Sequence, residues 1–201
     1  MLRELLLSLS SAMNAPHAGG IGRKLPGKRL WWQLISVKLD QKERLMHMVD
    51  TIQVALWEPE IPPNTGNIAR LCAATATPLH LIGRLGFRLD DRELRRAGLD
   101  YWSSVTMLHH DNYADFEATQ TRDKIICIET SAALTYADIT YQPGDCLLFG
   151  NESSGLPASI LARYPGRVAR IPMLTQSVRS LNLANSVAIV VYEALRQLHA
   201  W

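Results

Sequence analysis

The sequence predicts an α/β fold built on a mostly parallel sheet with helices on both faces. From residue 51 onward, short apolar runs alternate with segments of helical pattern, the order typical of strand–helix–strand units. The apolar runs are continuous rather than alternating, as in strands that are buried on both faces. The chain has 201 residues and no internal repeat, so it can form one domain with a full core, or one domain plus an appendage.

The expected elements follow one another in a regular order along the chain. Apolar runs bounded by turn residues predict strands at 52–57, 80–82, 105–108, 124–129, 146–149 and 168–171. Cap and breaker residues predict helices at about 68–76, 90–97, 113–119, 156–164 and 183–198. The run Asn64-Thr65-Gly66-Asn67 would cap the first helix, and Pro157 would begin the fourth. The last helix is apolar on most faces, so we expect it to be buried.

The first 49 residues differ from the rest of the chain. They contain eight Lys or Arg residues and three acids, whereas residues 50–201 contain 13 and 16. Such a basic leader could be an organelle-targeting or RNA-tethering arm, or it could be a disordered extension or a start codon assigned too early. We favour the second interpretation. Residues 1–49 are then disordered or not native, and residues 50–201 form the functional domain.

Composition excludes several classes of protein. A hydrophobic content of 47% and a charged content of 20% are ordinary for a globular protein. The apolar run at 5–9 is too short to cross a membrane, so we expect no membrane partner. Cys72, Cys127 and Cys146 form no CxxC pair and lie in apolar segments, which indicates buried thiols in a reducing, cytoplasmic compartment. The histidines lack metal-ligand spacing, so we expect no metal.

Common cofactor and catalytic motifs are missing from the sequence. The first strand is followed by Trp57-Glu58-Pro59 instead of the G-x-G-x-x-G run of dinucleotide-binding proteins. The P-loop, G-x-S-x-G and H-E-x-x-H motifs are missing as well. Nicotinamide redox chemistry, nucleotide hydrolysis and serine-hydrolase chemistry are therefore disfavoured.

The first positive motif surrounds the expected start of a helix, in residues 64–70. Asn64 or Thr65 could simply cap this helix, but a cap does not need Arg70. A guanidinium near a helix N-terminus, where free N–H groups also attract anions, is a plausible phosphate anchor.

Two further motifs follow strands near the carboxyl end of the chain. In residues 150–157, Gly150 allows a close approach of the backbone to a ligand, and Gly155 allows a left-handed turn before Pro157. Glu152, between these glycines, could bind a ligand or merely complement a helix N-terminus. In residues 180–185, Ser180 and Asn182 could cap the last helix or hold a small ligand and a hydroxyl substrate.

Together these motifs resemble those of the SpoU branch of the SPOUT RNA methyltransferases. The matching blocks are Asn-Thr-Gly-Asn-Ile-x-Arg (64–70), Phe-Gly-x-Glu-x-x-Gly-Leu-Pro (149–157) and Ile-Pro-Met…Arg-Ser-Leu-Asn-Leu (171–183). The stretches 58–67 and 94–101 look characteristic of the subgroup that methylates the wobble cytidine or uridine of tRNA. The resemblance implies a C-terminal trefoil knot, a homodimer, tRNA as partner and S-adenosyl-L-methionine (AdoMet) as methyl donor.

The resemblance also implies which residues form the site. Cofactor binding is expected at Ile128, Gly150, Ile171, Leu174 and Ser180. Catalysis is expected from Arg70, which would position the ribose hydroxyl from the partner protomer, with Glu152, Ser180 and Asn182 orienting the site. RNA binding is expected at Asn64, Asn67, Arg70, Arg95 and Arg96. The wider arginine cluster at 84–96 could equally be a solvated helix face.

The RNA target has alternatives. Asn151 stands where the wobble subgroup often has Pro, and the loop 175–178 is one residue longer than in some members. The alternatives are 2′-O-methylation of another tRNA or rRNA position, or a non-catalytic RNA-binding domain of the same fold.

Overall fold

The computed structural model describes residues 51–88 and 104–200. Three of the predictions lie outside the described residues: the basic extension 1–49, the helix expected at 90–97, and the RNA-binding pair Arg95 and Arg96.

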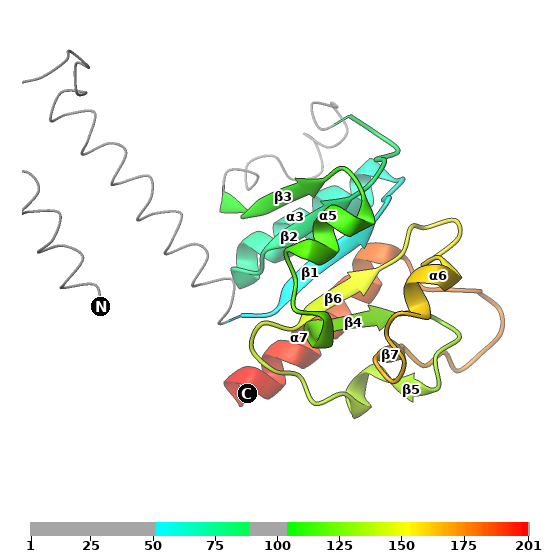
Figure 1. Ribbon diagram of the computed structural model, residues 1–201. Helices are drawn as coiled ribbons and strands as arrows, with labels where there is room; N and C mark the ends of the chain where they lie inside the picture. The colour runs from blue at the N-terminus through cyan, green and yellow to red at the C-terminus, as the bar shows by residue number, and fades with distance from the viewer. Residues whose placement is uncertain (1–50, 89–103, 201) are drawn as a thin grey trace, which may run out of the picture. The chain divides into compact units, whose positions relative to one another are not determined.

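One parallel sheet organises the described part of the chain. Its strands are β1 (Gln53–Trp57), β2 (Leu79–Ile82), β3 (Met107–His110), β4 (Ile125–Ile128), β5 (Leu134–Thr135), β6 (Cys146–Phe149) and β7 (Val168–Arg170). The strand order is β3-β2-β1-β6-β4-β7-β5, and every neighbouring pair is parallel (Figure 1). The predicted parallel α/β fold is confirmed. The trefoil knot stays a prediction.

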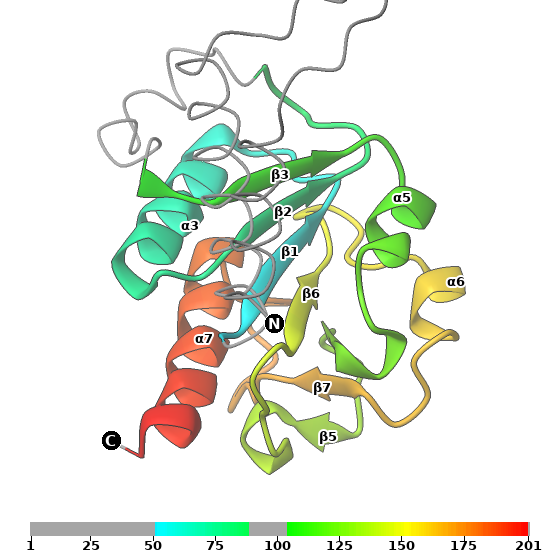
Figure 2. The same ribbon diagram turned by 60° about the vertical axis from the view of Figure 1, so that its left-hand side comes forward.

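Helices cover both faces of this sheet. They are α3 (Pro62–Thr75), α5 (Tyr113–Ala118), α6 (Ala158–Leu161) and α7 (Leu183–His199), with 3-10 turns η2 (Arg122–Lys124) and η3 (Tyr136–Asp138). Figure 2 shows α3 and α7 together on one side of the sheet, and α5 and α6 on the other. Continuous apolar strands are what two covered faces require, because successive side chains point to opposite faces.

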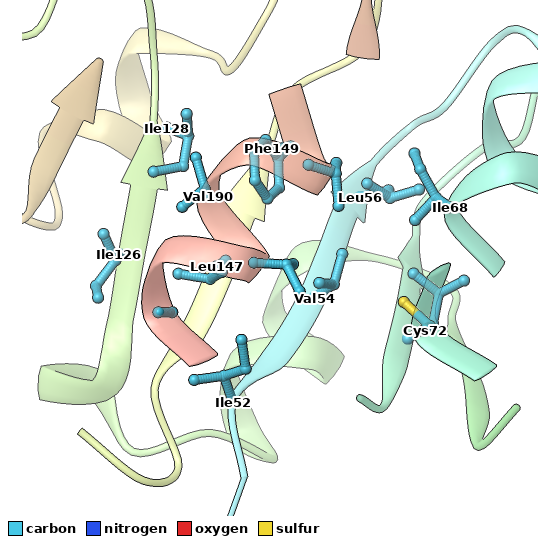
Figure 3. Packing of buried hydrophobic residues seen from close by; sticks show 14 of the residues in the cluster. Ile52, Val54, Leu56, Ile68, Cys72, Ile126, Ile128, Leu147, Phe149 and Val190 are labelled. Carbon is cyan, nitrogen blue, oxygen red and sulfur yellow. The ribbon is translucent and has the colours of Figure 1, made fainter. Parts of the chain in front are cut away.

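The strands therefore feed two separate cores. Val54 and Leu56 pack on the α3 and α7 side with Leu147 and Phe149, as Figure 3 shows. Ala55 points the other way, toward the cluster that contains residues of α5 and α6. Each large apolar side chain buried in this way contributes about 1.5–3 kcal/mol, so the cores hold the strand ends in place.

Two predicted helix boundaries are wrong. Helix α3 begins at Pro62, six residues before the predicted start at Ile68, so the 64–67 run lies inside the helix instead of capping it. Pro62 and Pro63 can open the helix because proline lacks the N–H that a first turn leaves unpaired. Helix α6 covers only Ala158–Leu161, so the range 156–164 is too long. The two-residue strand β5 was not predicted.

The strand order places a switch point beside β6. From β1 the chain proceeds outward through β2 and β3, and then returns to form β4 on the far side of β6. Strand β6 lies between β1 and β4, so connections leave in opposite directions from this point. In open parallel sheets, ligands bind at such a point, beside the carboxyl ends of the strands.

Candidate functional site

A cavity of about 480 Å³ lies at the carboxyl ends of β4, β6 and β7. Ile128 ends β4, Phe149 ends β6, and Ile171 follows β7, and all three line the cavity. The turn after β6 and the segment leading into α7 complete its wall. A volume of this size suits a small organic ligand or cofactor.

The turn after β6 is built on a close backbone approach. Asn151 and Gly155 form an antiparallel bridge, in which the Gly155 amide donates to the Asn151 carbonyl at 3.1 Å. A Cβ on Gly150 would lie 2.0 Å from the carbonyl carbon of Gly155, so only glycine fits there. Gly155 has φ +69°, the left-handed conformation expected of it.

Asn151 stabilises the same turn through its side chain. Its Oδ1 accepts hydrogen bonds from the Ser154 amide at 2.7 Å and from the Ser154 hydroxyl at 2.9 Å. A proline at this position could not make these bonds. Asn151, at the position where the wobble subgroup often has Pro, is thus compatible with a well-formed turn.

Glu152 connects this turn to the start of α3. Its carboxylate accepts hydrogen bonds from the Glu60 amide at 2.9 Å, the Ile61 amide at 3.3 Å and the Asn64 side-chain amide at 2.8 Å. The Ser153 hydroxyl adds a hydrogen bond to the Glu60 carboxylate. Glu152 therefore complements the N-terminus of helix α3, although Asn64 in this helix and Glu152 are 88 residues apart in the sequence.

Asn64 extends the connection to α7. Its Oδ1 accepts a hydrogen bond from the Asn182 side-chain amide at 2.9 Å. Asn182 in turn caps α7, because its Oδ1 accepts from the Ala184 amide at 2.9 Å and the Asn185 amide at 3.3 Å. One chain of hydrogen bonds, Glu152–Asn64–Asn182, thus joins the three sequence motifs beside the cavity.

The predicted site residues divide into two groups. The cavity is lined by Ile128, Gly150, Ile171, Ser180, Asn182, Glu152 and Asn64. Arg70 and Asn67 lie on the exposed side of α3 and do not line it. Leu174 also lies outside the lining, with its side chain 100% exposed. Asn64 is only 6% exposed, so its polar groups serve the network just described.

Two charged lining residues were not predicted. Glu129 directly follows β4, and Arg179 precedes Ser180. With Glu152, these are the charged residues among the described residues that line the cavity. The position of Glu129 at a strand's carboxyl end was a usable signal, because that edge of the sheet gathers ligand-binding groups.

The buried thiols do not supply a nucleophile. Burial, with a smaller contribution from the nearby Glu129 carboxylate, raises the pKa of Cys127, next to the cavity-lining Ile128, to about 12. Burial alone raises the pKa of Cys72 to about 12. Both thiols are protonated at neutral pH and hence weakly reactive.

The described residues contain neither a cluster of metal-binding side chains nor a helix able to span a membrane. Within residues 51–88 and 104–200, no group of three or more His, Cys, Asp or Glu residues could hold a metal ion. No helix in the same two ranges has the length and apolar character needed to cross a membrane.

The chain resembles known proteins along most of the described region. It is 48% identical over 148 residues to the tRNA (cytidine(34)-2'-O)-methyltransferase of Escherichia coli strain K12, covering 73% of this chain and 94% of the relative. The enzyme of the same name from Yersinia pestis is 48% identical over 153 residues, covering 73% of this chain and 94% of the relative.

Solved structures give a consistent result. One, described as giving structural insights into the 2-OH methylation of C/U34 on tRNA, superposes with a TM-score of 0.72 at 43% identity, covering 76% of this chain and 99% of that one. An AdoMet-bound rRNA methyltransferase from Sinorhizobium meliloti superposes with a TM-score of 0.68 at 28% identity, covering 77% of this chain and 60% of that one. Residues 51–192 match the SpoU rRNA Methylase family, and the chain therefore belongs to that family.

Proposed function

We propose that this protein transfers a methyl group from AdoMet to the ribose 2′-hydroxyl of the wobble nucleotide of tRNA, cytidine or uridine 34. One observation carries the proposal. The three motifs converge on one cavity at the switch point of the sheet, in a chain 48% identical to a tRNA (cytidine(34)-2'-O)-methyltransferase.

The cavity suits AdoMet in size and in the character of its wall. Ile128, Phe149 and Ile171 offer an apolar surface for an adenine ring, and the turn after β6 contributes backbone groups. Ser180 and the charged residues provide partners for the polar end of the molecule. When bound, AdoMet supplies a methyl group on a positively charged sulfur.

Positioning is the main task left to the protein. A ribose hydroxyl is a weak nucleophile, so the reaction needs it held in line with the methyl group. A guanidinium is a poor general base but a good anion ligand, so Arg70 suits the role of anchoring the hydroxyl and the adjacent phosphate. Glu152 and Asn64 fix the first turns of the helix that carries Arg70.

Arg70 and the cavity of its own chain do not meet, and this favours a homodimer. Arg70 lies on the exposed side of α3 and is not among the lining residues. We therefore assign Arg70 to the cavity of a partner protomer. In this arrangement each site contains the cavity of one chain and the guanidinium of the other, and tRNA is held between them.

We also propose which residues form the catalytic domain and where in the cell the protein acts. Residues 50–201 form the methyltransferase domain, supported by the family match over residues 51–192. The family match does not extend to residues 1–49. A tRNA substrate makes the cytoplasm the location that we propose.

The test is methylation of total tRNA with labelled AdoMet, followed by mapping of the modified nucleotide. We expect label on the 2′-oxygen of nucleotide 34. Label at another tRNA position or in rRNA would replace the proposed target with the alternative one. Failure to bind AdoMet in calorimetry would instead favour a non-catalytic RNA-binding domain.

A further inference from the structure

We infer that Glu129 binds hydrogen-bond donors of AdoMet, either the ribose hydroxyls or the ammonium group, and thereby helps the cavity select this cofactor. The inference rests on the proposed function. Glu129 is not part of the three motifs, and its case depends on its place in the cavity wall.

The carboxylate of Glu129 is held in a fixed position. The backbone amide of Glu129 continues the β4–β7 pairing by donating to the Ala169 carbonyl at 2.9 Å. One carboxylate oxygen, Oε1, accepts hydrogen bonds from the Thr130 amide at 2.8 Å and the Thr130 hydroxyl at 3.0 Å. The other, Oε2, accepts from the Leu156 amide at 3.2 Å.

The turn after β6 is shaped to admit this carboxylate. A Cβ on Gly155 would lie 2.6 Å from Oε2 of Glu129, so a side chain there would displace the carboxylate. Gly155 and Glu129 both line the cavity. The absence of a side chain at Gly155 therefore lets a charged oxygen reach the wall beside the ligand.

This oxygen can accept a further hydrogen bond. Each oxygen of an ionised carboxylate has about two acceptor positions. The bonds described fill both positions on Oε1 and one on Oε2. A donor from a ligand in the cavity can take the remaining position without breaking the bonds that hold the turn.

The charge of the cavity also suits AdoMet. Among the described lining residues, Glu129 and Glu152 carry negative charge and Arg179 carries positive charge. AdoMet has a sulfonium, an ammonium and a carboxylate, and so carries one net positive charge. A carboxylate in a partly enclosed cavity attracts such a ligand more strongly than one in open water.

The test compares wild type, Glu129→Gln and Asp123→Asn by calorimetry. Asp123 is a matched control, an exposed carboxylate in η2 before β4, whereas Glu129 follows that strand. The ligands are AdoMet, S-adenosylhomocysteine, 5′-methylthioadenosine and the 2′,3′-dideoxy form of the last. We expect Glu129→Gln to weaken the affinity for AdoMet about tenfold, as for a lost charge-assisted hydrogen bond. We expect Asp123→Asn to leave this affinity unchanged.

The ratio of affinities for two ligands distinguishes a direct contact of Glu129 with the ligand from a purely structural role of this residue. A contact to the ribose predicts that the wild-type preference for 5′-methylthioadenosine over its dideoxy form shrinks in Glu129→Gln. A contact to the ammonium predicts that the preference for S-adenosylhomocysteine over 5′-methylthioadenosine shrinks.

Two outcomes would overturn the inference. One is unchanged affinity for every ligand. The other is an equal loss for all ligands with both preferences intact, which would mean that Glu129 only supports the turn. Wild-type protein that fails to bind AdoMet would refute the proposed function itself, and that result is distinct from either outcome.

Discussion

The side-chain amide of Asn182 donates a hydrogen bond to Oδ1 of Asn64 at 2.9 Å, across 118 residues of sequence. The same Asn64 donates to Glu152, so one buried amide connects the helix α3, the turn after β6 and the start of α7. Satisfied polar networks of this kind fix the relative positions of the elements that they join. The geometry of the cavity therefore depends on Asn64, although this residue need not touch a ligand.

A double-mutant cycle tests this coupling. Asn182→Ala removes both the bond to Asn64 and the cap of α7, so we expect the free energy of unfolding to fall by about 1–2 kcal/mol. Asn64→Ala should cost a similar amount. Since the two residues share one bond, the double mutant should lose about 1 kcal/mol less than the sum. Urea unfolding measures all three variants, and strictly additive losses would contradict the coupling.

Gly150 and Gly166 form a matched pair of glycine substitutions. Gly150→Ala places a methyl group 2.0 Å from the carbonyl carbon of Gly155, so the turn must move, at a cost of about 1–3 kcal/mol. We expect this variant to lose at least about tenfold in AdoMet affinity, because the turn lines the cavity.

Gly166→Ala is the control, because an added Cβ at this glycine meets no neighbouring atom. At Gly166, φ is +79° and nothing lies within 4 Å of an added Cβ. Gly166→Ala should lose about 1 kcal/mol of stability and keep its affinity for AdoMet. Equal affinities for the two variants in calorimetry would show that the turn does not shape the binding site.

His80 should make stability depend on pH. The residue is fully buried, with Nε2 2.8 Å from Oε1 of Gln53 and Nδ1 2.9 Å from Nε2 of His110. Burial, with a smaller contribution from the charge of His110, lowers the pKa of His80 from 6.5 to about 3. Between these values the unfolded chain binds a proton that the folded chain does not, so stability falls as pH falls.

The comparison is wild type against His80→Gln between pH 7 and pH 5. We expect wild type to lose about 1–2 kcal/mol more than the variant over this range, since His110 titrates in both proteins. Chemical denaturation at each pH gives the two curves. Parallel curves would mean that His80 does not carry the dependence.

Arg70 should act on the cavity of the other protomer. We expect Arg70→Ala to lose methyl transfer by a factor of about 100 or more while its AdoMet affinity stays near wild type, because Arg70 lies outside the cavity. Loss of AdoMet binding in this variant would contradict the positioning role.

Mixed dimers test whether Arg70 acts on the cavity of its own chain or on that of the partner protomer. Arg70→Ala and Gly150→Ala protomers, each impaired alone at limiting AdoMet, should regain activity when refolded together, because the heterodimer has one intact cavity facing one intact arginine. Transfer within a single chain predicts that the mixture stays inactive. Size-exclusion chromatography with light scattering provides the dimer control.

The sequence predicted most of the fold because its strands are buried on both faces. Strand β6 was predicted at 146–149, where the structure has it, because its four residues are apolar and bounded by turn residues. The start of α3 was wrong because Asn64 and Asn67 have the residue types of caps. Pro62 and Pro63 were a local signal for the true start, since proline favours the first turn of a helix, but local pattern cannot show that Glu152 satisfies the amides there from another element.

The location of the site could be predicted more fully than the contacts within it. The family resemblance implied Ile128, Gly150 and Ile171, and their positions at strand ends agree with where a parallel sheet binds ligands. The link from Asn64 to Asn182 depends on the packing of α3 beside α7, which no spacing in the sequence specifies. Glu129 belongs to no motif, and its position at the end of β4 was the one signal for it before the fold placed it in the cavity wall.

The most direct test of the central claim uses a tRNA with a single 2′-deoxy nucleotide at position 34. Labelled AdoMet, the full-length protein and either this tRNA or its all-ribose counterpart are incubated under identical conditions. We expect label in the all-ribose tRNA and none in the 2′-deoxy tRNA, because the accepting oxygen is missing. Equal labelling of both tRNAs would contradict methylation at the wobble ribose.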